Sequence, residues 1–331
     1  MIDRRQFLIG SIAASLSPLV KGCDQSAPWE RAAYRKKDHS KVAILEAKDY
    51  EIPLKDILVK GIRLFRLSPQ GKRVVLKPNL VEYDPGGVIN THPAVISAAI
   101  EAFKNLGARE VLVAEGPGHR RDNEYLLTAS GLYSILKDHK VRYVDLNTDD
   151  VRSVKLQSRF TGLSHLYLPE TVLKADLLVS MAKLKTHHWA GVTLSLKNMF
   201  GLIPGAVYGW PKNILHWAGV HESILDINSA LPIPQFAIVD GIVGMEGNGP
   251  IQGEPKHSGV IVFGDDLVAV DATVARLMKI EPRAIKYLAK AEQFLGNTTS
   301  EKILQIGESL DRFQQDYQVI HSFQHLKALS G

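Results

Sequence analysis

Apolar and polar positions along this chain fall into blocks that predict strands and helices in turn. Residues 42–45 form a short apolar run of the length of a buried strand, and residues 54–65 carry apolar side chains at helical spacing. Further strands are predicted at 73–76, 110–114, 141–146, 177–180, 236–239 and 259–263, and further helices at 92–106, 124–137 and 267–278. Nearly continuous apolar strands that alternate with helices indicate the α/β class, with a mostly parallel sheet covered by helices.

Two segments depart from this alternation. Residues 187–234 are richer in Gly, Trp and Pro than the rest of the chain, which predicts an inserted lobe or lid. Residues 24–40 are polar and basic and are interpreted as a tether. The remaining residues, 41–331, are enough for one α/β domain.

The first residues have the pattern of an export signal. Arg4 and Arg5 stand before the run 7–20, which has no charged side chain and is shorter than the roughly 20 apolar residues of a membrane-spanning helix. The order Arg-Arg-x-Phe-Leu resembles a twin-arginine signal, so residues 1–23 are predicted to be a signal peptide read by the twin-arginine translocase.

Cys23 closes this segment and is the single cysteine of the chain. Residues 20–23 resemble a lipoprotein cleavage box, which predicts a lipid on Cys23 and a location on the periplasmic side of the inner membrane. The alternatives are an ordinary cleavage site and an apolar run that stays uncleaved as an anchor. One cysteine excludes an intrachain disulfide and a cysteine-ligated iron–sulfur cluster.

Composition narrows the choice of partner. The net charge is +5, and 45% of residues are hydrophobic, an ordinary globular value. Outside a basic cluster at residues 31–37, positive charge is spread along the chain without an aromatic-interleaved stripe, so nucleic acid is not an expected partner.

Polar residues follow five of the predicted strands. They are Lys77 to Asn79, Glu115 to His119, Lys183 to His188, Asp240 to Ile242 and Gly264 to Asp266. Ligands of open parallel sheets bind outside the carboxyl ends of the strands, so we expect these residues to converge on one edge.

The basic residues of this set suggest an anion site. Period two in an extended segment would place Lys183, Lys185 and His187 on one face, where cationic donors suit phosphate or carboxylate. A solvated strand edge is the alternative, because lysine is common there. The predicted anion-binding residues are Lys77, Asn79, Lys183, Lys185 and Asn198. His187 and Lys197 are the predicted catalytic residues, with His187 as acid or base.

Acidic residues on the same loops suggest a cation site. Asp240, Glu246 and Glu115 are hard oxygen ligands of the kind that bind a divalent cation such as magnesium or calcium. Asp271 lies inside the predicted helix 267–278, where its charge needs a partner, and Lys197 or Lys183 could supply one.

These segments together resemble the domain of unknown function 362 (DUF362) family. The resemblance rests on Lys77-Pro78-Asn79, Thr91-His92-Pro93, Glu115-Gly116, Lys183-x-Lys185-Thr186-His187, Leu196-Lys197-Asn198-x-Phe200-Gly201, Asp240-Gly241, Glu246-Gly247-x-Gly249-Pro250 and Asp271-Ala272, in this order, and covers residues 42–282. It implies a single α/β unit and supplies no catalytic residues. Some relatives carry a ferredoxin-like iron–sulfur module, which the single cysteine excludes here.

The sequence leaves two main hypotheses open. The first is a metal-assisted enzyme that acts on an anionic small molecule. The second is a non-catalytic protein that captures an anionic ligand, or that serves as a cofactor-maturation or redox accessory protein. Clustered ionisable groups in a cleft favour both equally.

Overall fold

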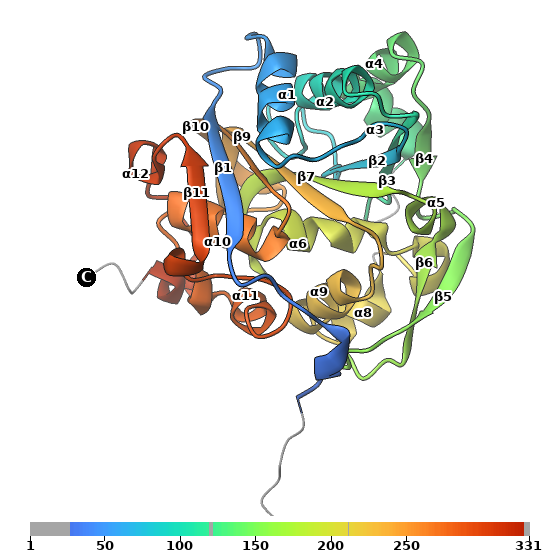
Figure 1. Cartoon of the computed structure of the whole chain (residues 1–331), viewed down its shortest axis with the longest axis vertical. Helices are drawn as coiled ribbons and strands as arrows, with labels where there is room; N and C mark the ends of the chain where they lie inside the picture. The colour runs from blue at the N-terminus through green and yellow to red at the C-terminus, as the bar shows by residue number, and fades with distance from the viewer. Residues whose placement is uncertain (1–26, 119–121, 211, 328–331) are drawn as a thin grey trace, which may run out of the picture.

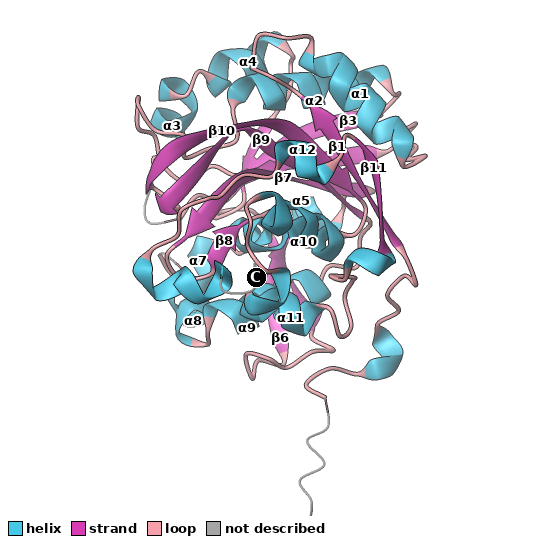
Figure 2. Ribbon diagram, turned by 90° about the vertical axis from the view of Figure 1, so that its left-hand side faces the viewer, coloured by secondary structure: helices cyan, strands magenta, loops and turns pink. Residues whose placement is uncertain are grey.

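The computed structural model describes residues 27–118, 122–210 and 212–327, which form a central β-sheet between two layers of helices (Figure 1 and Figure 2). The predicted signal peptide and Cys23 lie outside the described residues. In the described part of the chain, every helix is too short or too polar to cross a membrane.

Within the described residues the central sheet has nine strands in the order β11-β1-β10-β9-β7-β2-β3-β4, with β8 beside β7. The strands are β1 (Ser40–Glu46), β2 (Arg73–Pro78), β3 (Glu110–Glu115), β4 (Tyr143–Asp145), β7 (Leu177–His187), β8 (Gly191–Thr193), β9 (Gln235–Asn248), β10 (Gln252–Gly264) and β11 (Ile303–Gly307). The run β9-β7-β2-β3-β4 is parallel throughout, and β1 is parallel to β11. The predicted α/β fold with a mostly parallel sheet is confirmed.

Helices cover both faces of the sheet, and each layer has its own apolar core. One layer is α1 (Leu54–Leu64), α2 (Pro93–Asn105), α3 (Asn123–Ala129) and α4 (Leu132–Asp138). The other is α5 (Glu170–Leu173), α6 (Ser195–Asn198), α7 (Gly205–Tyr208), α8 (Asn213–Trp217), α9 (Val220–Ser229), α10 (Leu267–Leu277), α11 (Lys286–Ala291) and α12 (Leu310–Phe313). A separate hairpin, β5 (Val151–Lys155) and β6 (His165–Pro169), flanks this second layer.

Residues 187–234, predicted as an inserted lobe, supply part of the second helical layer. Leu196 of α6 and Leu225 of α9 belong to the same buried cluster as Val239 of the sheet. The segment is therefore integrated with the core of the domain.

The last part of the predicted tether also packs on the domain. Trp29 stacks on Phe294 with 4.8 Å between ring centroids, and it forms an isolated β-bridge with Ser158. The chain thus contacts the folded domain before β1 begins.

The prediction that the polar residues after all five strands meet at one edge is wrong for the strand β10. β10 runs antiparallel to β9 and to β1, so Asp265 and Asp266 after β10 lie near Gln235, where β9 begins. The carboxyl ends of β2, β3 and β7 do meet, because these three strands are adjacent and parallel.

Candidate functional site

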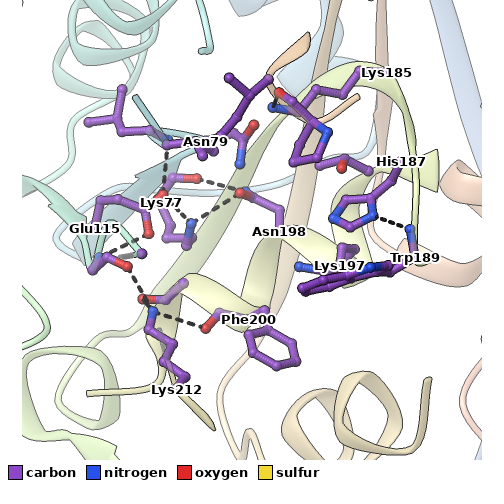
Figure 3. Close-up of a pocket in the computed structure, with 18 of the residues that line it drawn as sticks. Lys77, Asn79, Glu115, Lys185, His187, Trp189, Lys197, Asn198, Phe200 and Lys212 are labelled. Carbon is purple, nitrogen blue, oxygen red and sulfur yellow. Dashed lines mark hydrogen bonds and ion pairs between the residues drawn. The ribbon is translucent and has the colours of Figure 1, made fainter. Parts of the chain in front are cut away.

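A cavity of about 270 Å³ lies at the carboxyl ends of β2, β3 and β7, closed on one side by α6 and the segment that follows it (Figure 3). Among the described residues, four lysines and one carboxylate line it. These are Lys77, Lys185, Lys197, Lys212 and Glu115. Amino groups outnumber the carboxylate, so the cavity is suited to an anion.

A buried ion pair forms its base. The ammonium of Lys77 contacts the Glu115 carboxylate, and both side chains are at most 2% exposed. Lys77 also donates to Asn198 Oδ1 at 3.0 Å, and Asn198 Nδ2 donates to the hydroxyl of Ser180 at 3.0 Å. Burial lowers the pKa of Lys77, and the nearby Glu115 charge opposes that shift. Asn198, which is itself hydrogen-bonded to Ser180, holds the ammonium end of this ion pair in position.

A glycine lies beside this pair. A Cβ at Gly201 would come too close to the Glu115 carboxylate and the Lys77 ammonium, so a larger residue would displace the pair. Gly201 lies just after α6, and its carbonyl accepts a hydrogen bond from the backbone N–H of Gly116 at 3.1 Å. This close approach joins the end of β3 to the α6 segment.

Two further lysines are held by backbone carbonyls. Lys185 Nζ donates to the carbonyls of Ile89 at 2.7 Å and Pro250 at 3.2 Å. Lys212 Nζ reaches the carbonyl of Gly116 at 2.7 Å and those that follow α6 (Figure 3). Burial lowers the pKa of Lys212 to about 7, with Glu115 acting in the opposite direction.

Lys197, unlike the other three lysines of the cavity, makes no hydrogen bond or ion pair with the described residues. Its Nζ forms a cation–π contact, 4.5 Å from the centre of the Phe200 ring. Burial, and next the charge of Lys77, lower its pKa to about 8. The side chain stays partly accessible from the cavity. Lys197 thus presents an amino group that a ligand can reach.

Helix α6, which carries Lys197, is anchored by Asp271 of α10. The Asp271 carboxylate accepts hydrogen bonds from the backbone N–H groups of Ser195 at 2.7 Å and Leu196 at 2.9 Å. The partner of Asp271 is thus the backbone, and not Lys197 or Lys183 as predicted, because the first amides of a helix have no partner within the helix.

His187 has a fixed tautomer. Its Nδ1 accepts hydrogen bonds from the backbone N–H groups of Trp189 at 3.0 Å and Ala190 at 3.2 Å (Figure 3). Burial, with Lys197 next in effect, holds the pKa of His187 well below its ordinary value. The neutral ring therefore carries its proton on Nε2 and serves as a hydrogen-bond donor. This arrangement does not support the predicted acid or base role of His187.

Two polar atoms in the lining are buried without a hydrogen-bond partner among the described residues. They are Oδ1 of Asn79 and Oγ1 of Thr193. Buried polar groups are normally paired, so a cavity lined by unpaired ones is suited to a polar ligand.

Aromatic side chains form the outer wall of the cavity. Trp189 is 56% exposed and lies 5.5 Å, between ring centroids, from His216, which in turn lies 4.9 Å from Phe200. The pocket combines cationic groups with an apolar wall, which is the character of a site for a small organic anion.

Lys183, also predicted to bind the anion, faces another part of the molecule. Its Nζ donates to Asp240 Oδ2 at 3.0 Å and to the hydroxyl of Tyr50 at 2.9 Å. Asp240 also accepts from the backbone N–H of His92 at 2.9 Å, which fixes the start of α2. The register between β7 and β9 shifts opposite this stretch, so Lys183 lies beside Asp240 and Lys185 beside Met245.

The three predicted metal ligands do not converge. Glu115 pairs with Lys77, Asp240 with Lys183, and Glu246 with Lys256 at 3.1 Å. The described residues contain no group of three or more His, Cys, Asp or Glu side chains that could hold a metal ion. Each of these carboxylates is neutralised by an ammonium group, so the set does not fit a divalent cation.

The structure brings together seven of the predicted site residues, which are Lys77, Asn79, Glu115, Lys185, His187, Lys197 and Asn198. Asn198 positions Lys77, because its amide is fully used by Lys77 and Ser180. Sequence reasoning missed Lys212, Thr193 and His216. Lys212 stands alone in a loop, and no spacing in the sequence links it to the other lysines.

The fold and the pocket define an α/β protein with a lysine-lined cavity at the carboxyl edge of its parallel strands. The chain belongs to the DUF362 family, a domain of unknown function, whose pattern matches residues 74–276. The matched residues include every lysine of the cavity.

A curated relative is the thylakoid-associated protein sll1697 of Synechocystis sp., which is 26% identical over 244 residues, 70% of this chain and 71% of the relative. Among solved structures, a protein from Thermotoga maritima matches with a TM-score of 0.41 over 67% of this chain and 57% of its own. The lactate racemase apoprotein from Thermoanaerobacterium thermosaccharolyticum matches with a TM-score of 0.38 over 67% and 54%. Both are 14% identical, and this chain spans a little over half of their length.

Proposed function

We propose that this protein binds a small organic anion, a carboxylate or phosphate compound, in the cavity between β2, β3, β7 and α6. The observation that carries the proposal is the excess of amino groups there: four lysines line the cavity with one carboxylate among the described residues. Buried charges need partners, and Glu115 neutralises only one of the four. A divalent cation is left out of the proposal, because the predicted carboxylate ligands are paired elsewhere.

Lys197 gives the most direct test. We expect Lys197→Met to weaken the binding of a small anion by about ten- to a hundredfold, because a hydrogen bond to a charged group contributes about 1.5–3 kcal/mol. The measurement is isothermal titration calorimetry against a panel of small carboxylates and phosphates. Lys60→Met is the control, since Lys60 is an exposed lysine of α1 on the opposite face of the sheet. Equal affinities of the Lys197 and Lys60 variants would contradict the proposal, as would wild-type protein that binds none of the panel.

The affinity should also depend on pH in a defined direction. Lys212, with a pKa of about 7, and Lys197, with a pKa of about 8, are charged below these values and lose their protons above them. An anion prefers the charged forms, so affinity is highest below about pH 7 and falls by up to about tenfold per pH unit above about pH 8. Calorimetry at a series of pH values checks this, and Lys197→Met should remove the upper step. An affinity that is constant between about pH 6 and about pH 9 would contradict the role of the charged forms of Lys197 and Lys212 in anion binding.

We also propose that the protein is exported by the twin-arginine translocase and held on the periplasmic side of the inner membrane by a lipid on Cys23. Arg4, Arg5 and the run 7–20 support the route, and the box at 20–23 supports the lipid. Trp29, which packs on the domain, follows Cys23 by six positions, so such a lipid would hold the domain near the membrane surface. Cell fractionation of the chain with Arg4 and Arg5 both changed to Lys tests the route.

A further inference from the structure

Lys197 differs from the other lysines of the cavity in what its nitrogen touches. The Nζ atoms of Lys77, Lys185 and Lys212 each donate to two or more oxygen acceptors. Lys197 Nζ lies over the Phe200 ring and makes no hydrogen bond or ion pair with the described residues. Once it has lost a proton, no hydrogen bond from these residues occupies its lone pair, and the side chain lines the cavity.

The surroundings of Lys197 favour the neutral amine. Burial and the nearby charge of Lys77 lower its pKa to about 8, and these two causes are the ones that activate lysine nucleophiles. Lys212, with a pKa of about 7, also becomes neutral in this pH range, but its nitrogen stays hydrogen-bonded to carbonyl oxygens. Lys77, which is paired with Glu115, is the ammonium group that attracts the anionic part of a ligand.

We propose that Lys197 forms a Schiff base with a small carbonyl compound that carries an anionic group, either a carboxylate or a phosphate. This inference rests on the proposed function, because the anionic group places the carbonyl carbon next to Nζ. The amine nitrogen of Lys197 adds to the carbonyl carbon, and the carbon–oxygen π bond breaks. Both amine protons are transferred to the oxygen, which leaves as water, and a carbon–nitrogen double bond remains. No oxidant or reductant is needed.

Neighbouring groups fit this step. His187, neutral and protonated on Nε2, lines the same cavity and can donate a hydrogen bond to the carbonyl oxygen. Phe200 lies against the amine and Trp189 lines the same cavity, so apolar surface adjoins the position of the imine, which water would hydrolyse. Asp271 fixes the helix that carries Lys197, so the amine holds its position.

Borohydride trapping tests the inference on the full domain. The protein is incubated with glyoxylate, glyceraldehyde 3-phosphate or the neutral aldehyde glyceraldehyde, reduced with sodium cyanoborohydride, digested and mapped by mass spectrometry. We expect more reduced adduct on the peptide of Lys197 with at least one of the two anionic compounds than with glyceraldehyde. Which of the two reacts identifies the anionic group as carboxylate or phosphate. Adduct at Lys197 should exceed that at exposed Lys60 by about tenfold or more, since a pKa near 8 gives far more neutral amine than an ordinary lysine.

Lys197→Arg should lose the trapped adduct, because arginine cannot form an imine. Binding of unreactive anions by wild-type protein, measured beside the trapping, separates this inference from the proposed function. Anion binding by wild-type protein without adduct at Lys197 would overturn the Schiff base and leave the proposed function standing. Adduct spread evenly over exposed lysines would overturn it as well. Absence of both binding and adduct in wild-type protein would overturn the two proposals together.

Discussion

Glu115→Ala should lower the free energy of unfolding by about 3–5 kcal/mol, because it leaves the buried ammonium of Lys77 without its counter-charge. The Glu115 carboxylate also accepts hydrogen bonds from the backbone N–H groups of Leu80 at 3.1 Å and Gly116 at 2.9 Å. The substitution therefore removes an ion pair and two backbone contacts from the centre of the site. Urea unfolding followed by circular dichroism measures the loss.

The matched control is Glu110→Ala on the same strand, β3. Glu110 pairs with Arg73 at 3.1 Å, but its side chain is 41% exposed, so its removal should cost less than about 1 kcal/mol. Lys77→Met together with Glu115→Gln should be less destabilising than Glu115→Ala alone, since no buried charge is then left unpaired. Similar losses for Glu110→Ala and Glu115→Ala would show that the buried pair is not important for stability.

Asp271→Ala is also expected to lower the free energy of unfolding substantially. It leaves the buried N–H groups of Ser195 and Leu196 without an acceptor, and each unpaired group costs about 1–3 kcal/mol. Helix α6 would lose its anchor, so anion binding through Lys197 should weaken along with stability. Denaturant unfolding and calorimetry measure the two effects. Asp265→Ala is the control, because Asp265 forms a partly exposed pair with Lys37 and should change neither property appreciably.

The pH dependence of stability gives an independent test of the burial of Asp271. Burial raises the pKa of Asp271 from 3.8 to about 7. The folded protein then binds a proton that the unfolded chain has lost, so this contribution is present below about pH 4 and disappears as the pH rises through 7. Wild-type protein should lose up to about 1.4 kcal/mol per pH unit in that window relative to Asp271→Asn, which does not titrate. A constant difference between the two proteins across the window would contradict the assignment.

The fold could be predicted from the sequence because its pattern is local. The strands near residues 73–76, 110–114 and 177–180 are apolar runs with few alternatives, whereas only the structure shows that they are neighbours in the sheet. The polar residues after these strands were predicted to meet, and Lys77, Glu115 and Lys185 do line one cavity. The direction of β10 could not be read from its residues, since an apolar run is the same in either direction.

The chemistry of the site depended on contacts between residues far apart in the chain. The sequence by itself determined the α/β class and the set of lysines that could carry positive charge to one edge of the sheet, because hydrophobic periodicity and strand ends are properties of neighbouring residues. Only the tertiary structure decided which charges cancel. In it, Lys183 pairs with Asp240 and Lys77 pairs with Glu115. Asp271 accepts hydrogen bonds from the backbone of α6, and Lys212 reaches the cavity from a loop. The ion pairs, the burial and the pKa values that leave Lys197 open to a ligand arise from distances in space, which spacing along the chain does not specify.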